Sequence, residues 1–146
     1  MTNIKQTNRG FTIVELLIVI VVIAILAAIS IVAYNGIQNR GKASSAQSLA
    51  SQTAKKAEAY NTVQSSYPTL TQLTATTSTV KEAQLDDPTK VTGAVPTSEA
   101  TVQYIQCTTG ARVGWFDATK PSGTPVTYIG IGGATSIASS AGITTC

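Results

Sequence analysis

The chain has 146 residues and a net charge of +3, with no histidine and only two cysteines. Without histidine it lacks the commonest general base and the commonest transition-metal ligand, and two cysteines alone are too few for a structural zinc site. Lys5 and Arg9 precede a long apolar segment, and the other eight basic side chains nearly balance the seven acidic ones. We therefore expect no nucleic-acid-binding surface, metal, cofactor or catalytic site.

The dominant feature is the apolar segment at residues 11–33, in which only Thr12, Glu15 and Ser30 have polar side chains. As a helix this segment is about 34 Å long, enough to cross a bilayer core of about 30 Å. A charged side chain inside a membrane segment is costly, so it marks a functional residue by default. The sequence therefore predicts a function for the Glu15 carboxylate.

Residues 1–10 are polar, positively charged and end in Gly10, which is typical of a targeting leader with its N-terminus in the cytoplasm. An ordinary signal peptide is one alternative, because cleavage after Ser30 in the small triplet 28–30 would release a soluble domain. The segment is long for such a peptide, contains Glu15 and has no helix breaker. A simple signal anchor is the second alternative, but it leaves Glu15 without a role.

After residue 33 the pattern becomes amphipathic and predicts that one helix continues from about residue 11 to about residue 62. Its first half would lie in lipid or a protein assembly, and its second half against a globular head. Gly36 and Gly41 are the expected weak points. The predicted buried face consists of small, mostly apolar residues at three- and four-residue steps: Ala43, Ala46, Ala50, Thr53, Ala57 and Tyr60.

The remaining residues predict a small head with a β-sheet. Proline at position 68 ends the long helix, one more helical turn can follow, and a long connection with a short strand or turn comes next. The tail after the last strand is small and polar and needs an anchor. Strands are predicted at residues 101–107, 111–116 and 126–131, with a hairpin turn at 108–110.

The two cysteines, Cys107 and Cys146, lie at the end of the first predicted strand and at the end of the tail. Outside the cytoplasm a disulfide between them is expected, and it would tie the tail to the strand. It would close a loop of about 40 residues and stabilise the fold by roughly 4 kcal/mol in the chain-entropy model. The alternative is a pair of buried free thiols.

A cut between Gly10 and Phe11 would give Glu15 a partner. The new α-amino group has a reference pKa of about 7.7–8.0 and would be mostly cationic near neutral pH. The amine of one chain could then neutralise Glu15 of a neighbour, and head-to-tail repetition of that contact gives a helical filament. Ala24 and Ala28 form a small-xxx-small face that allows close helix packing.

Gly10-Phe11-Thr12-x-x-Glu15 followed by about twenty apolar residues resembles the class III signal of type IV pilins and pseudopilins. The resemblance implies that a prepilin peptidase cuts after Gly10 and N-methylates Phe11. It also implies that Glu15 recognises the amino terminus of another pilin subunit. An assembly ATPase and an inner-membrane platform protein would move subunits from the membrane into a surface filament.

The implied fold is α+β, a pilin-like α/β roll in which a small antiparallel sheet packs on the second half of the long helix. A disulfide-bounded C-terminal segment, here ending at Cys146, matches a common pilin feature. The implied segments are a leader at 1–10, a transmembrane and filament-core half at 11–34, an amphipathic half at 35–62 and a head at 63–146.

The chain departs from many family members, because Val32 stands where a proline is common and Ala24 where a glycine is common. We therefore predict a continuous membrane half, with any bend displaced toward residues 36–41. The expected function is a structural, non-enzymatic pilus subunit. Alternatives are a pseudopilin or minor pilin of a secretion or DNA-uptake system, or a membrane-anchored or secreted binding domain.

Overall fold

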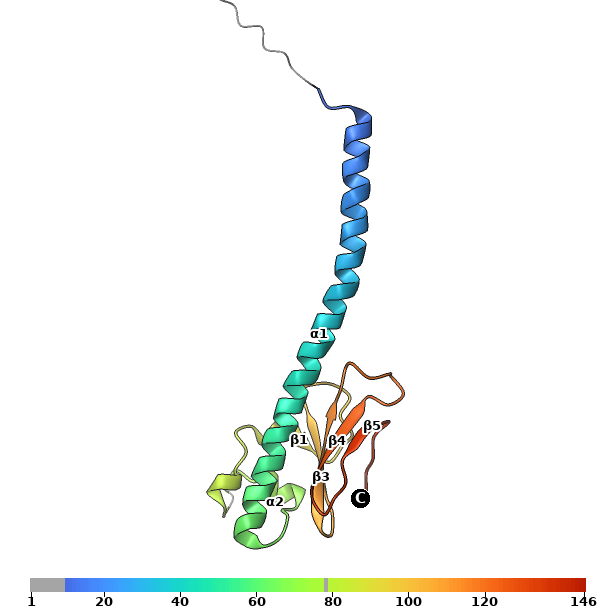
Figure 1. The fold of residues 1–146 in the computed structure, drawn as a ribbon. Coiled ribbons are helices and arrows are strands. Elements are labelled where there is room, and N and C mark those ends of the chain that lie inside the picture. Colours follow the sequence, from blue (N-terminus) through green and yellow to red (C-terminus); the bar gives the residue numbers. More distant parts are fainter. Residues whose placement is uncertain (1–9, 78) are drawn as a thin grey trace, which may run out of the picture. The chain divides into compact units, whose positions relative to one another are not determined.

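The computed structural model describes residues 10–77 and 79–146 (Figure 1). Residues 1–9, which include most of the expected leader with Lys5 and Arg9, lie outside the described residues. The chain divides into two units after Ile37, and the second unit, Gln38–Cys146, contains the whole sheet. The long N-terminal helix and the sheet confirm the predicted α+β architecture.

Helix α1 runs over Ile13–Gln64 without interruption. It begins and ends two residues later than the sequence predicts, because Thr12 caps its first turn and Ser65 takes a left-handed φ of 55° directly after it. Helical structure continues through residues 24–32 and through Gly36 and Gly41. Its continuity in an assembled filament stays a prediction.

The second half of α1 packs against the head through its alanine face. Five of the six positions predicted for this face are buried, but Ala43 is only half-buried. Ala54, which the periodicity does not include, is buried as well, because the neighbouring elements cover a wider face of the helix than one narrow stripe. The small side chains allow the helix and the sheet to approach closely.

The head contains a five-stranded sheet in the order β1-β2-β3-β4-β5. The three predicted strands are present, and β5 is a further strand in the small, polar tail, for which the sequence predicts no strand. The expected antiparallel sheet is mixed, because the two-residue strand β1 in the long connection pairs parallel to β2. The bounds are β1 Val91–Thr92, β2 Val102–Gln106, β3 Gly110–Phe116, β4 Val126–Gly132 and β5 Ile137–Ser140.

Short helices precede the sheet, including the helical turn expected after proline 68. Helix α2, Leu70–Thr74, begins with a capping box in which Thr69 and Gln72 each bind the backbone N–H of the other. Two 3₁₀ turns follow at Lys81–Ala83 and Pro88–Lys90. The long connection to β2 is thus locally ordered.

Both faces of the sheet are covered. The inner face of β2 and β3 packs on α1 through Tyr104, Val113 and Trp115, whereas Ile105 and Tyr128 belong to a second cluster with residues of the tail. The ring of Tyr128 lies across Gly114, where a Cβ atom would come within 2.4 Å of it. The tail therefore covers an apolar surface that the strands cannot bury alone.

The buried phenol of Tyr104 predicts a loss of stability at alkaline pH. Its hydroxyl donates a hydrogen bond of 2.8 Å to the Pro68 carbonyl, and burial raises its pKa. Because the folded-state pKa lies above the unfolded value of about 10, the stabilisation is complete below that pH and is lost above it. Urea unfolding of Tyr104→Phe should show a smaller decrease between pH 7 and pH 11 than the wild type. Equal decreases would contradict this role.

Candidate functional site

The start of α1 holds the Glu15 carboxylate in a reciprocal cap. The backbone N–H of Thr12 donates to Glu15 Oε2 at 2.7 Å, and the Thr12 hydroxyl donates to the same oxygen at 2.8 Å. The N–H of Glu15 donates in return to Thr12 Oγ1 at 3.2 Å. The carboxylate is thus held at the helix N-terminus, where the macrodipole favours negative charge.

Thr12 contacts Glu15 directly, and the sequence does not single it out as a candidate site residue. The signal was available, because threonine followed three positions later by glutamate at the start of an apolar run is the capping-box pattern. The structure adds that both oxygen contacts converge on one carboxylate oxygen, Oε2. Oε1 has no hydrogen-bond partner among the described residues.

The first unit exposes an apolar helix surface. An 18-residue window of α1 has a mean hydropathy of 3.4, and no part of that window is buried. Phe11 is 84% exposed, and Ala24 and Ala28 are exposed one helical turn apart. The one polar side chain in the middle of this surface, Ser30, donates to the Leu26 carbonyl at 2.7 Å. The helix is long and apolar enough to cross a membrane.

The predicted cleavage and assembly residues lie along one segment of the chain and are close to one another only because they are close in sequence. Gly10 and Phe11 are exposed and precede helix α1, which begins at Ile13. Glu15 lies in the first turn of that helix, four residues after Phe11. Ala24 and Ala28 lie farther along the same helix. Among the described residues, the hydrogen bonds of the Glu15 side chain are with Thr12 and not with Phe11.

A disulfide joins Cys107 and Cys146, with their Cα atoms 5.7 Å apart. Arg112 holds the same tail by donating to the backbone oxygens of Thr135 and Cys146, both at 3.0 Å, and to the Thr135 hydroxyl. The N–H of Ile143 donates to the Tyr128 hydroxyl at 2.9 Å. The sequence pointed to the disulfide but to neither of the other anchors.

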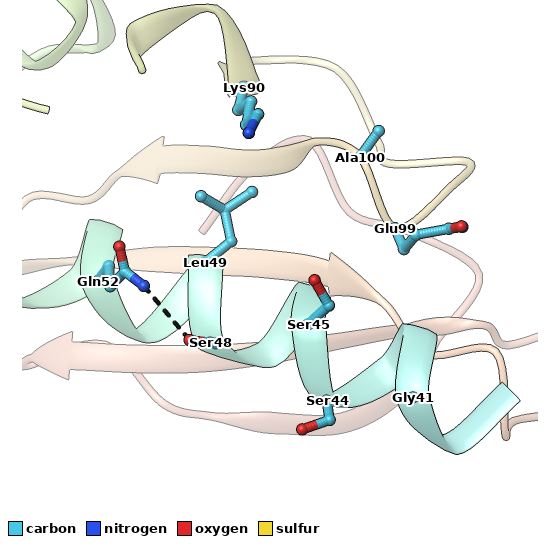
Figure 2. A pocket seen from close by; sticks show the side chains of 9 residues that line it. All are labelled: Gly41, Ser44, Ser45, Ser48, Leu49, Gln52, Lys90, Glu99 and Ala100. Carbon is cyan, nitrogen blue, oxygen red and sulfur yellow. Dashed lines mark hydrogen bonds between the residues drawn. The ribbon is translucent and has the colours of Figure 1, made fainter. Parts of the chain in front are cut away.

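An open groove of about 760 Å³ lies between α1 and the segment around residues 90–100 (Figure 2). Ser45, Ser48 and Leu49 line its helix side, and Lys90 and Glu99 lie on the opposite side. Within residues 10–77 and 79–146, no group of His, Cys, Asp and Glu side chains is placed to hold a metal ion. The groove therefore offers hydroxyl, amide and single charged groups.

In a comparison with protein families, residues 5–31 of the chain match the model of the prokaryotic N-terminal methylation motif. No significant match is found among curated proteins or solved structures. The match covers Gly10, Phe11 and Glu15 together with most of the apolar segment at residues 11–33. It points to a structural protein anchored in a membrane before assembly. The chain carries, at residues 5–31, the class III prepilin signal of type IV pilins and pseudopilins.

Proposed function

We propose that the chain is a prepilin, the precursor of a structural subunit of a type IV pilus or a related filament. The observation that carries this proposal is the register of Gly10, Phe11 and Glu15 with an exposed apolar helix inside the matched motif. A prepilin peptidase cuts after Gly10 and methylates the amine of Phe11. The membrane holds the subunit until an assembly ATPase and an inner-membrane platform protein transfer it to the filament.

The apolar helix is surrounded by different groups before and after assembly. In the membrane, residues 11–34 are covered by lipid; in the filament, equivalent helices of other subunits cover them, with close contacts at Ala24 and Ala28. The Phe11 amine of one subunit neutralises Glu15 of its neighbour and sets the axial register. Residues 35–62 and the head at 63–146 then lie outside the cytoplasm, where the disulfide is stable.

N-terminal sequencing of the mature protein tests the proposal. A mature chain that begins at Phe11, with or without a methyl group, supports the prepilin. A chain that begins at Ile31 identifies an ordinary signal peptide, and an uncut chain identifies a simple anchor; both results overturn it. Imaging surface filaments, and measuring whether this chain is their bulk component, separates a major subunit from a pseudopilin or minor pilin.

Thr12 should matter for assembly through its hydroxyl. Thr12→Val removes the group that donates to Glu15 Oε2 and accepts from the Glu15 N–H. We expect normal cleavage but a several-fold lower ratio of filament to membrane protein, because an N-cap contributes about 1 kcal/mol. Thr12→Ser keeps the hydroxyl and is the matched control. If both variants assemble equally well, the cap does not position Glu15.

A further inference from the structure

A row of three paired residues crosses the sheet on the face that the tail covers. Gln103 in β2 pairs with Gly114 in β3, which pairs in turn with Tyr128 in β4. Gly114 has no side chain, and a Cβ atom there would lie 2.4 Å from the Tyr128 ring. The ring can therefore cross β3, and its hydroxyl donates to Gln103 Oε1 at 2.7 Å.

Each member of this buried pair also binds a segment outside the central strands. The Tyr128 hydroxyl accepts from the N–H of Ile143 in the tail at 2.9 Å. Gln103 Nε2 donates to the Gly93 carbonyl, directly after β1, at 3.0 Å. Gln103 and Tyr128 are 0% and 1% exposed, so a partner that detaches leaves a polar group without water. The three hydrogen bonds form one chain, in which the loss of one bond weakens the next.

The same two segments also contact each other directly. Gly142 in the tail has a φ of 120°, and a Cβ atom there would lie 2.4 Å from Val95 Cγ1. Both the backbone conformation and the close approach require glycine. Val95 and Ile143 pack side by side on the apolar cluster that contains Tyr128. A buried polar chain and an apolar contact thus join the tail to the segment after β1.

The segment at residues 93–99 also contacts α1. Glu99 Oε1 lies 3.5 Å from Lys42 Nζ of the helix, in a partly exposed ion pair. An ion pair of this kind stabilises little by itself. Strand β1, which precedes the segment, pairs with β2 over only two residues. The order of the segment beside α1 therefore depends on the contacts that the tail supplies.

We propose that residues 141–143 of the tail and residues 93–99 form a clasp that opens and closes as one unit around the Gln103–Tyr128 pair. When the tail detaches, the hydrogen bond to Gly93 and the contact with Val95 are lost with it. Contiguous parts of a folded protein commonly open together in this way. A change at the tail thus reaches the segment beside α1. The inference concerns the head alone and does not depend on the proposed filament.

The two ends of the clasp can be measured separately. The Ile143 N–H exchanges with solvent when the tail detaches, and the Gln103 side-chain amide exchanges when its bond to Gly93 breaks. If the clasp opens as one unit, both protons exchange through the same opening and respond equally to a change in either segment. Hydrogen exchange detected by NMR on the full chain in detergent measures both rates.

Gly142→Ala perturbs the clasp from the tail. The new Cβ atom presses on Val95 and strains the positive φ of this position. We expect exchange at the Ile143 N–H and at the Gln103 amide to accelerate by the same factor, at least about fivefold, which is the scale of one lost hydrogen bond. Gly123→Ala is the matched control and should change neither rate, because its Cβ atom would meet nothing within 4 Å beyond its chain neighbours.

The pattern of exchange decides between the clasp and two independent segments. Acceleration at Ile143 alone, or unchanged exchange at both protons, overturns the clasp. Equal acceleration of the amides in the middle of β3 also overturns it, because the whole head then opens. If Gly142→Ala does not fold, Val95→Ala perturbs the clasp from the other segment and should accelerate both protons equally. Acceleration of the Gln103 amide alone in that variant overturns the proposal.

Discussion

Replacement of Glu15 by alanine should leave cleavage after Gly10 intact but almost abolish filament formation. In the proposed filament this change leaves the Phe11 amine of a neighbouring subunit without its counter-charge in a low-dielectric environment. Removal of one member of a buried ion pair costs roughly 3–5 kcal/mol. A loss of that size corresponds to a decrease of more than about a hundredfold in association. The measurement is the amount of the chain in sheared filaments relative to the membrane.

Glu15→Gln separates the two functions of this residue. Glutamine can replace glutamate in a capping box, so the contacts with Thr12 can remain while the charge is lost. We expect this variant to keep its helical start and to fail in assembly almost as fully as alanine does. Normal filaments from Glu15→Ala would refute the charge pairing. If Glu15→Ala fails to assemble but Glu15→Gln forms normal filaments, the role of Glu15 in assembly is to cap the helix and not to supply a charge.

The second large effect is expected from the disulfide. The double variant Cys107→Ser/Cys146→Ser should lose roughly 4 kcal/mol of unfolding free energy, because the disulfide closes a loop with a sequence separation of 39 residues. Urea unfolding of the full chain in detergent measures the difference. The variant should still fold, because Arg112 and Tyr128 continue to hold the tail.

The noncovalent anchors provide the control for this experiment. In the double variant, hydrogen exchange should increase mainly beyond Ile143, the last residue that donates to Tyr128. Adding Tyr128→Phe should extend that exchange toward β5, because the Ile143 N–H then loses the hydroxyl that accepts its hydrogen bond. An unchanged unfolding free energy in the double variant would show that these anchors, and not the disulfide, hold the tail.

Local patterns in the sequence predicted much of this molecule. The apolar segment with Glu15 predicted the first half of α1, and the alanine steps predicted most of its buried face. Alternating residues predicted β2, β3 and β4. These features depend on hydrophobic periodicity, which is a property of neighbouring residues and can be recognised without knowing their tertiary partners.

Strand β5 and the mixed sheet could not be predicted in the same way. Ile137–Ser140 has a small, polar sequence with little strand propensity, and it is a strand because β4 offers a free edge beside it. The two residues of β1 are too short to form a pattern and pair with β2 only after the long connection has folded back. Pairing with a neighbouring strand therefore decides that β1 and β5 form.

The sequence by itself determined the prepilin signal, the helix that follows it and the expectation that Glu15 has a function. The tertiary structure decided which side chains hold the tail and which face of α1 stays open beside the head. Arg112 reaches Thr135, and Ser48 lies in a groove opposite Lys90, through contacts between segments far apart in the chain. Such contacts leave no period in the sequence, because they depend on the path of the backbone and not on the spacing of residues along it.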